Sequence, residues 1–131
     1  MALFFRQYLE PETSTFTFLI AEPETREAAL VDSVKGQILT YLADIQKNNF
    51  KVTYLLETHI HADHVTGIAQ LLKIFPEAQI AISEKARVTC NRISLSEGTE
   101  VKLGKIVLKA LSRPFIRLFW VGARNQVACI C

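Results

Sequence analysis

The chain has 131 residues, half of them apolar and 21% charged, with a formal net charge of +2. This length suits one domain with a real hydrophobic core and is short for two. No basic run, no apolar stretch of transmembrane length and no leader-like start stand out, so we expect no nucleic acid partner, no membrane partner and a cytoplasmic location. The three cysteines, Cys90, Cys129 and Cys131, show no repeated spacing and predict no disulfide framework.

The N-terminal part predicts a hairpin followed by a helix. Residues 14–22 are rich in Thr, Phe and Ile and predict a strand, and residues 28–32 predict a second, short and buried strand after a Pro-Glu turn. Residues 34–48 predict a helix. The apolar residues at helical spacing in this segment are Ile38, Leu39, Leu42 and Ile45.

The following segments alternate between strand and helix. Residues 51–58 are almost continuously apolar, which is typical of a strand buried on both faces. Residues 65–75 carry a helical apolar stripe, and residues 78–83 predict another strand. Residues 92–112 alternate around two glycine turns and predict a meander, and a further strand is predicted across 115–121. This order predicts a mixed α/β fold with sheet pairing of both kinds.

The chemistry-bearing residues gather in the stretch ETHIHADHVTG, residues 57–67. It contains all three histidines of the chain, His59, His61 and His64, together with Asp63. Imidazoles two positions apart on extended backbone point the same way, so His59 and His61 can chelate one ion. Imidazoles with one carboxylate suit Zn(II), Fe(II) or Mn(II). Such a metal would lower the pKa of bound water or keep a coordination position open for O₂.

Four neighbouring residues each have two interpretations. Gly67 either permits a close approach of helix and loop or is a tolerated helix glycine. The Thr58 and Thr66 hydroxyls either support the metal ligands or face solvent. Asp32, at the end of a predicted strand, either orients a metal-bound histidine from behind or caps a turn.

These residues resemble a known family. THIHADHVTG is similar to the HxHxDH signature of the metallo-β-lactamase fold, and the Ala before the Asp and the VTG after it resemble its persulfide dioxygenase (ethylmalonic encephalopathy protein-like) and glyoxalase II branches. The opening FFRQYLEPETSTFTFLIAEPETREAALVDSV resembles the start of persulfide dioxygenases, and the likeness runs from about Phe4 to Ser112. It implies the N-terminal half of an αββα sandwich, a mixed sheet with helices on one face.

The resemblance implies roles for the motif residues. His59 matches a histidine that binds the single iron of persulfide dioxygenases, and His61 matches the one beside that iron. Asp63 and His64 match the pair that serves a second metal in hydrolases of the fold, so all four are metal candidates and Asp63 is also the catalytic candidate. The implied cofactor is Fe(II), with Zn(II) as the alternative. The implied reaction oxidises glutathione persulfide with O₂ to sulfite and glutathione.

The chain departs from the family after about Ser112. Family members continue into a Pro-Gly-His loop and a later Thr-Gly-Asp segment that supply further ligands, whereas this chain has SRPFIRLF and no histidine after His64. One set of codons for SRPFIRLF, shifted by one base, encodes Pro-Gly-His-Ser-Phe-Gly-Cys. We therefore expect residues 1–112 to form the half-domain, residues 113–131 to be an atypical, out-of-frame tail, and activity to be impaired.

Two alternatives to the dioxygenase stay open. Within the fold, the alternative is a glyoxalase II-like thioester hydrolase acting on a glutathione-type substrate. Outside catalysis, the alternative is a metal-binding fragment whose exposed sheet surface favours association into homo-oligomers.

Overall fold

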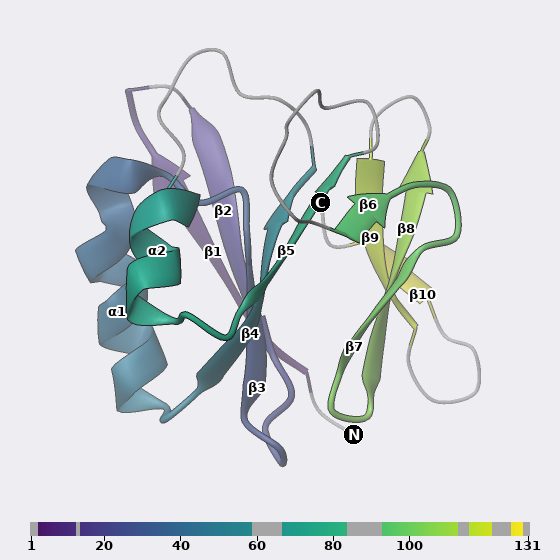
Figure 1. Ribbon diagram of the computed structural model, residues 1–131, viewed down its shortest axis with the longest axis horizontal. Coiled ribbons are helices and arrows are strands. Elements are labelled where there is room, and N and C mark those ends of the chain that lie inside the picture. Colours follow the sequence, from purple (N-terminus) through teal and green to yellow (C-terminus); the bar gives the residue numbers. More distant parts are fainter. Residues whose placement is uncertain are drawn as a thin grey trace.

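The computed structural model describes residues 3–12, 14–58, 67–83, 93–112, 116–121 and 127–129. These residues form two sheets packed face to face, with two helices covering the outer face of the larger sheet (Figure 1). The larger sheet has the strand order β1-β2-β3-β4-β5-β6 and the smaller one β10-β9-β8-β7. This is the mixed sheet with helices on one face that the sequence predicts.

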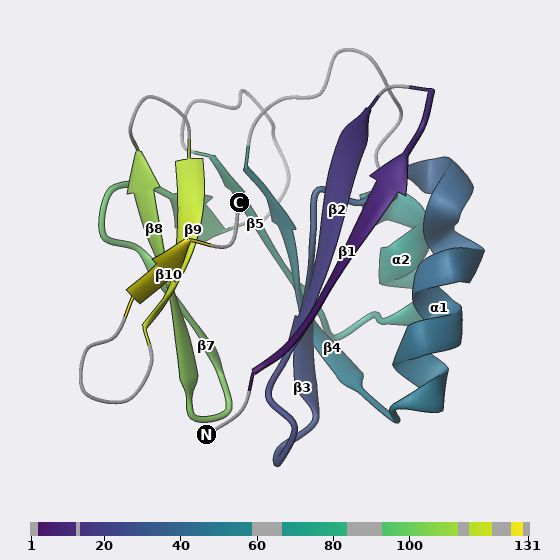
Figure 2. The same ribbon diagram turned by 180° about the vertical axis from the view of Figure 1, so that it is seen from behind.

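The larger sheet combines an antiparallel and a parallel part. Strands β1, β2 and β3 pair antiparallel, whereas β3, β4, β5 and β6 pair parallel. The helices α1 and α2 are the crossovers from β3 to β4 and from β4 to β5. Because such crossovers are right-handed and both step in the same direction across the sheet, the two helices lie on the same face (Figure 2). The bounds in this sheet are β1 Phe4–Glu10, β2 Thr15–Ala21, β3 Glu27–Val31, η1 Lys35–Gln37, α1 Ile38–Lys47, β4 Lys51–Glu57, α2 Ile68–Ile74, β5 Gln79–Ser83 and β6 Ile93–Leu95.

The smaller sheet is an antiparallel meander. Its strands are β7 Glu100–Leu103, β8 Ile106–Ser112, β9 Ile116–Val121 and β10 Val127–Cys129. Alternation in β7 and β8 turns Val101, Leu103 and Leu108 inward and leaves Lys102 and Lys109 exposed. The two turns predicted around glycine are present, with φ of 88° at Gly98 and 56° at Gly104.

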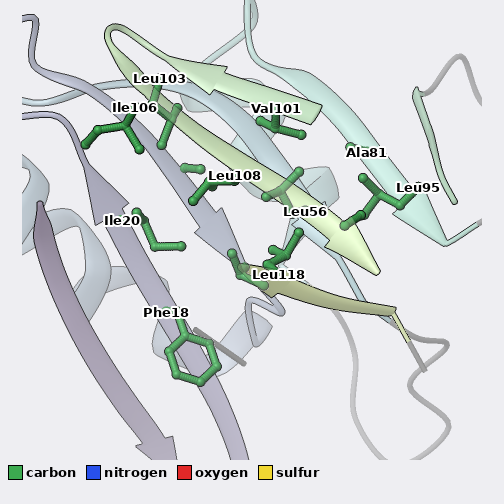
Figure 3. Close-up of a cluster of buried hydrophobic side chains, with 13 residues drawn as sticks. Phe18, Ile20, Leu56, Ala81, Leu95, Val101, Leu103, Ile106, Leu108 and Leu118 are labelled. Carbon is green, nitrogen blue, oxygen red and sulfur yellow. The ribbon is translucent and has the colours of Figure 1, made fainter. Parts of the chain in front are cut away.

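Two hydrophobic cores hold the three layers together. One lies between the sheets, where side chains of both sheets interdigitate, as Leu56, Leu108 and Leu118 do in Figure 3. The other lies between the larger sheet and the helices and includes Leu30, Tyr41, Leu55 and Leu71. Strand β4 contributes to both cores, which confirms its expected burial on two faces.

Three details differ from the sequence-based expectations. The start of the predicted meander, Ile93–Leu95, is not part of the smaller sheet: as β6 it pairs parallel with β5 in the larger sheet. Leu39 does not face the core: its side chain is 82% exposed, and the buried stripe of α1 is made by Ile38, Tyr41 and Ile45. Strand β1 was not predicted, because Tyr8 is its only buried residue and its polar residues hide any alternation. No helix in the described ranges combines the length and apolar character needed to cross a membrane.

Candidate functional site

Buried polar side chains concentrate at one edge of the larger sheet, the edge where its parallel strands end, toward the top of Figure 1. Among the described residues, the buried polar or charged side chains at this edge are Thr17, Asp32, Ser33, Glu57, Thr58 and Ser83. Only Glu22 among the described buried polar residues lies elsewhere, in the β2–β3 turn. Carboxyl ends of parallel strands are the usual position for reactive groups in α/β sheets, so this edge is the candidate site.

Asp32 holds the residue that precedes the histidine motif. Its carboxylate accepts a hydrogen bond from the Thr58 backbone N–H at 2.8 Å and another from the Thr58 hydroxyl at 2.6 Å. Both residues are buried, with exposed fractions of 4% and 5%. Charge-assisted bonds of this kind are short and strong, and they fix the backbone at the end of β4. The solvent-facing alternative for the Thr58 hydroxyl is therefore wrong.

The backbone around Asp32 forms a sharp corner, residues 32–34. Asp32 has a φ of 57°, which places it in the left-handed region that Asp tolerates better than most residues. Its N–H donates to the Leu56 carbonyl at 2.8 Å, so the corner is also joined to β4 through the main chain. Asp32 thus holds Thr58, the residue before the motif. Its expected role in orienting a metal-bound histidine involves residues outside the described ranges and stays a prediction.

The same corner holds the other side of the motif. The Gly67 N–H donates to the Ser33 carbonyl at 3.2 Å, and a Cβ on Gly67 would lie 3.2 Å from the Ser33 hydroxyl oxygen. Gly67 therefore permits a close approach between the start of α2 and the corner, as one of its two interpretations proposed. Asp32 and Ser33 together anchor both flanks of residues 59–66.

The predicted metal ligands themselves, His59, His61, Asp63 and His64, lie outside the described residues, as does Thr66. Among the residues that the structure does describe, no three His, Cys, Asp or Glu side chains converge as a metal site. We call residues 59–64 the motif segment. Its three imidazoles and one carboxylate make a donor set that fits Fe(II) or Zn(II), and its flanks at Thr58 and Gly67 are fixed at the polar edge.

Three positioning residues were missed by the sequence analysis: Thr17, Ser33 and Tyr41. Tyr41 is fully buried, and its hydroxyl contacts Thr17 Oγ1 at 2.9 Å and the Val34 N–H at 3.2 Å. Burial raises the pKa of the Tyr41 phenol, the hydrogen bonds with Thr17 and the Val34 N–H oppose this rise, and the charges of Glu10 and Glu57 add to it. The sequence hinted only at Tyr41: a tyrosine stands on the buried side of the predicted helix, where an aliphatic residue would fill the core as well.

Comparison with known proteins defines the class. The family model of the Metallo-beta-lactamase superfamily matches residues 11–127 of this chain. The two packed sheets with helices on the outside of one, and the HxHxDH motif after a buried strand, agree with that match. The chain belongs to the metallo-β-lactamase superfamily.

The similarities within the superfamily point to glutathione-related enzymes. The chain is 32% identical to "Persulfide dioxygenase ETHE1, mitochondrial" of Mus musculus over 109 residues, which cover 83% of this chain and 42% of that protein. It is 33% identical to a hydroxyacylglutathione hydrolase of a Synechococcus strain over 90 residues, covering 67% of this chain and 34% of that protein. The crystal structure of ETHE1 from Myxococcus xanthus superposes with a TM-score of 0.83 at 30% identity, over 89% of this chain and 53% of that one. The chain thus spans less than half the length of these two curated relatives.

Proposed function

We propose that the motif segment binds a metal ion as part of a persulfide dioxygenase-like centre, with His59, His61, Asp63 and His64 as the ligand candidates. The observation that carries the proposal is the double anchorage of the segment, by Asp32 on Thr58 and by Ser33 on Gly67. Fixing the residues on both sides of the segment reduces the conformational entropy that the segment has to lose when it binds a metal, which raises affinity. The similarity to persulfide dioxygenases favours Fe(II), and Zn(II) is the alternative.

The chain's own residues prepare the site in two ways. The Asp32 carboxylate fixes the end of β4, and with it the direction in which the chain enters the motif segment. Asp63, proposed as the catalytic carboxylate, would hold or move a proton beside the substrate sulfur. When bound, Fe(II) can exchange electrons with O₂, whereas Zn(II) acts only as a Lewis acid.

The proposed substrate is a persulfide of glutathione type, oxidised by O₂ with one water to sulfite and the thiol. We expect little turnover from residues 1–131, because SRPFIRLF stands where the resemblance places a histidine loop that completes the ligand set. Catalytic metals usually have three protein ligands and one open position. Fewer ligands make the ion labile and leave the substrate without a fixed partner.

The proposed origin of this loss is a change of reading frame after about Ser112. The support is that codons for SRPFIRLF exist whose frame shifted by one base encodes a Pro-Gly-His loop. Sequencing the coding DNA tests this directly. Codons whose shifted frame gives no histidine at this place would remove the idea.

Oxygen uptake by the chain with glutathione persulfide and added Fe(II) tests the proposed function, with the His59→Ala variant as the control. We expect Fe(II) to bind to the unaltered chain and not to the variant, with slow oxygen uptake that the variant lacks. Turnover close to that of full-length persulfide dioxygenases would overturn the proposed impairment. Binding of no metal by either chain would contradict the metal centre and favour an inert, non-catalytic fragment.

A second candidate reaction is hydrolysis of a glutathione thioester. The observation that favours it is the 33% identity to a hydroxyacylglutathione hydrolase across 67% of this chain. The same protein, loaded with Zn(II), is assayed with a hydroxyacylglutathione and without O₂. Thioester cleavage faster than persulfide oxidation would favour the hydrolase over the dioxygenase.

We also propose that the chain self-associates through the exposed apolar side chains of β1 and β2, on the β1 side of the larger sheet. Phe5, Leu9 and Phe16 are 44%, 54% and 46% exposed, and Leu9 and Phe16 are direct partners across β1 and β2. A cluster of large apolar side chains on the edge strand β1 and its neighbour β2 favours contact between copies. Sedimentation velocity should show a dimer or larger species that Leu9→Lys shifts to monomer, and a monomeric unaltered chain would refute this.

A further inference from the structure

Two buried hydroxyl groups, those of Thr17 and Tyr41, are hydrogen-bonded to each other and support the corner formed by residues 32–34. The Thr17 hydroxyl has one proton, which it donates to the Asp32 carbonyl at 2.7 Å. The Tyr41 hydroxyl must therefore be the donor in its 2.9 Å contact with Thr17 Oγ1, and it accepts from the Val34 N–H at 3.2 Å. Each of these two hydroxyls donates one hydrogen bond and accepts another, and this cooperativity strengthens all three bonds.

We propose that Tyr41 and Thr17 are positioning residues for the metal centre, and this inference rests on the proposed function. Their hydroxyl pair binds the corner at its carbonyl in Asp32 and its N–H in Val34, on either side of Ser33. The corner in turn holds both flanks of the motif segment, at Thr58 and at Gly67. Loss of the Tyr41 hydroxyl thus loosens both flanks at once, although it touches neither.

Tyr8 offers a control with almost the same surroundings. Its ring packs edge-on against the ring of Tyr41 with centroids 5.0 Å apart, in the same core below α1. Its hydroxyl, however, donates to Asp44 at 2.6 Å and not to the corner. Removal of either hydroxyl deletes one oxygen from the same aromatic pair, but only one of the two deletions reaches the corner.

Amide hydrogen exchange, followed by NMR, tests the positioning itself and needs no metal. We expect Tyr41→Phe to speed the exchange of the Thr58 and Gly67 amides about fivefold to tenfold relative to the amide of Leu55 in β4. Tyr8→Phe should leave this ratio unchanged. Equal effects of both variants, or no change at Thr58 and Gly67, would overturn the proposal.

Zn(II) affinity, measured by competition with a chromophoric chelator, tests the consequence for the metal. Supporting groups around metal ligands typically contribute 10–100-fold to affinity, and we expect a loss of about tenfold for Tyr41→Phe and none for Tyr8→Phe. Thr17→Val should behave like Tyr41→Phe, whereas Thr17→Ser, which keeps the hydroxyl, should restore the affinity. Unaltered Zn(II) affinity in Tyr41→Phe would contradict the inference.

These outcomes also separate the inference from the proposed function. An unaltered chain that binds no Zn(II) contradicts the metal centre, and the exchange of the Thr58 and Gly67 amides then still decides whether the hydroxyl pair fixes the motif flanks. An unaltered chain that binds Zn(II) as tightly as Tyr41→Phe supports the metal centre and refutes the positioning role.

Discussion

Among the residues of the candidate site, Asp32 is the one whose replacement should lower the free energy of unfolding most. It accepts two hydrogen bonds from Thr58, and both residues are buried. A hydrogen bond to a charged group contributes about 2 kcal/mol, so Asp32→Ala should lose about 4 kcal/mol from the two bonds. Alanine at a φ of 57° costs about 1 kcal/mol more. The total, about 5 kcal/mol, is a large part of the stability of a small domain.

Asp32→Asn is the more informative variant, because asparagine tolerates the left-handed backbone and keeps one acceptor oxygen. It should lower the free energy of unfolding by about 2 kcal/mol, as should Thr58→Val, which removes only the hydroxyl. The double variant should lose about 2–3 kcal/mol and not 4, because the single changes break a shared bond.

Urea unfolding followed by far-UV circular dichroism measures these losses. Asp44→Asn is the control, since its carboxylate also has two partners, Arg6 and Tyr8, but lies away from the corner. It should cost about 1 kcal/mol or less and leave Zn(II) affinity unchanged. Strict additivity of Asp32→Asn and Thr58→Val, or an Asp32→Asn loss below about 0.5 kcal/mol, would refute the role given to Asp32.

Three further changes test the fold around the site. Gly104→Ala should cost more than Gly98→Ala, by about 1–2 kcal/mol in urea unfolding, because both have positive φ but only at Gly104 would the Cβ meet another side chain; equal losses would contradict this packing. Burial by itself would raise the pKa of Glu22, but the hydrogen bonds from Thr25 and Glu24 have the larger combined effect. The pKa of Glu22 therefore lies below its ordinary value of 4.5. Glu22 therefore stabilises the fold above about pH 4.5 and loses this effect as pH falls below it, so the unfolding free energy of Glu22→Gln should fall less on acidification than that of the unaltered chain; parallel pH profiles would count against it. Leu108→Ala, in the core between the sheets, should cost about 2–5 kcal/mol, whereas Leu39→Ala on the exposed side of α1 should cost almost nothing, and similar midpoints for the two would be inconsistent with the layer order.

The sequence predicts most of the fold because its apolar pattern is strong. The strand across 51–58 and the helix across 34–48 differ from the observed elements only at their ends, since burial on two faces and on one stripe leave clear periodicities. Strand β1 escapes because it lies at the sheet edge, where its pairing with β2 depends on a partner and not on its own alternation. Leu39 was wrongly assigned to the buried side of the helix, because the sequence does not show which side of an apolar stripe faces the sheet.

The candidate site, too, is only partly predictable from the sequence: its motif is a local pattern, whereas its supporting contacts join residues far apart in the chain. The motif segment is evident from its composition alone, because all three histidines of the chain gather there. Asp32 had two interpretations, and only the pairing of β3 with β4 brings it to Thr58, 26 residues later. The support from Thr17 and Tyr41 depends on a buried contact between a strand and a helix 24 residues apart, which no local pattern encodes.

The metal content of the purified chain, compared with that of its His59→Ala variant, tests the central claim that the motif segment is a metal site. Iron or zinc in the unaltered chain, lost in the variant while its circular dichroism spectrum is retained, is the result expected. Absence of both metals from the unaltered chain after Fe(II) or Zn(II) is supplied, or equal metal content in the two chains, would contradict the claim.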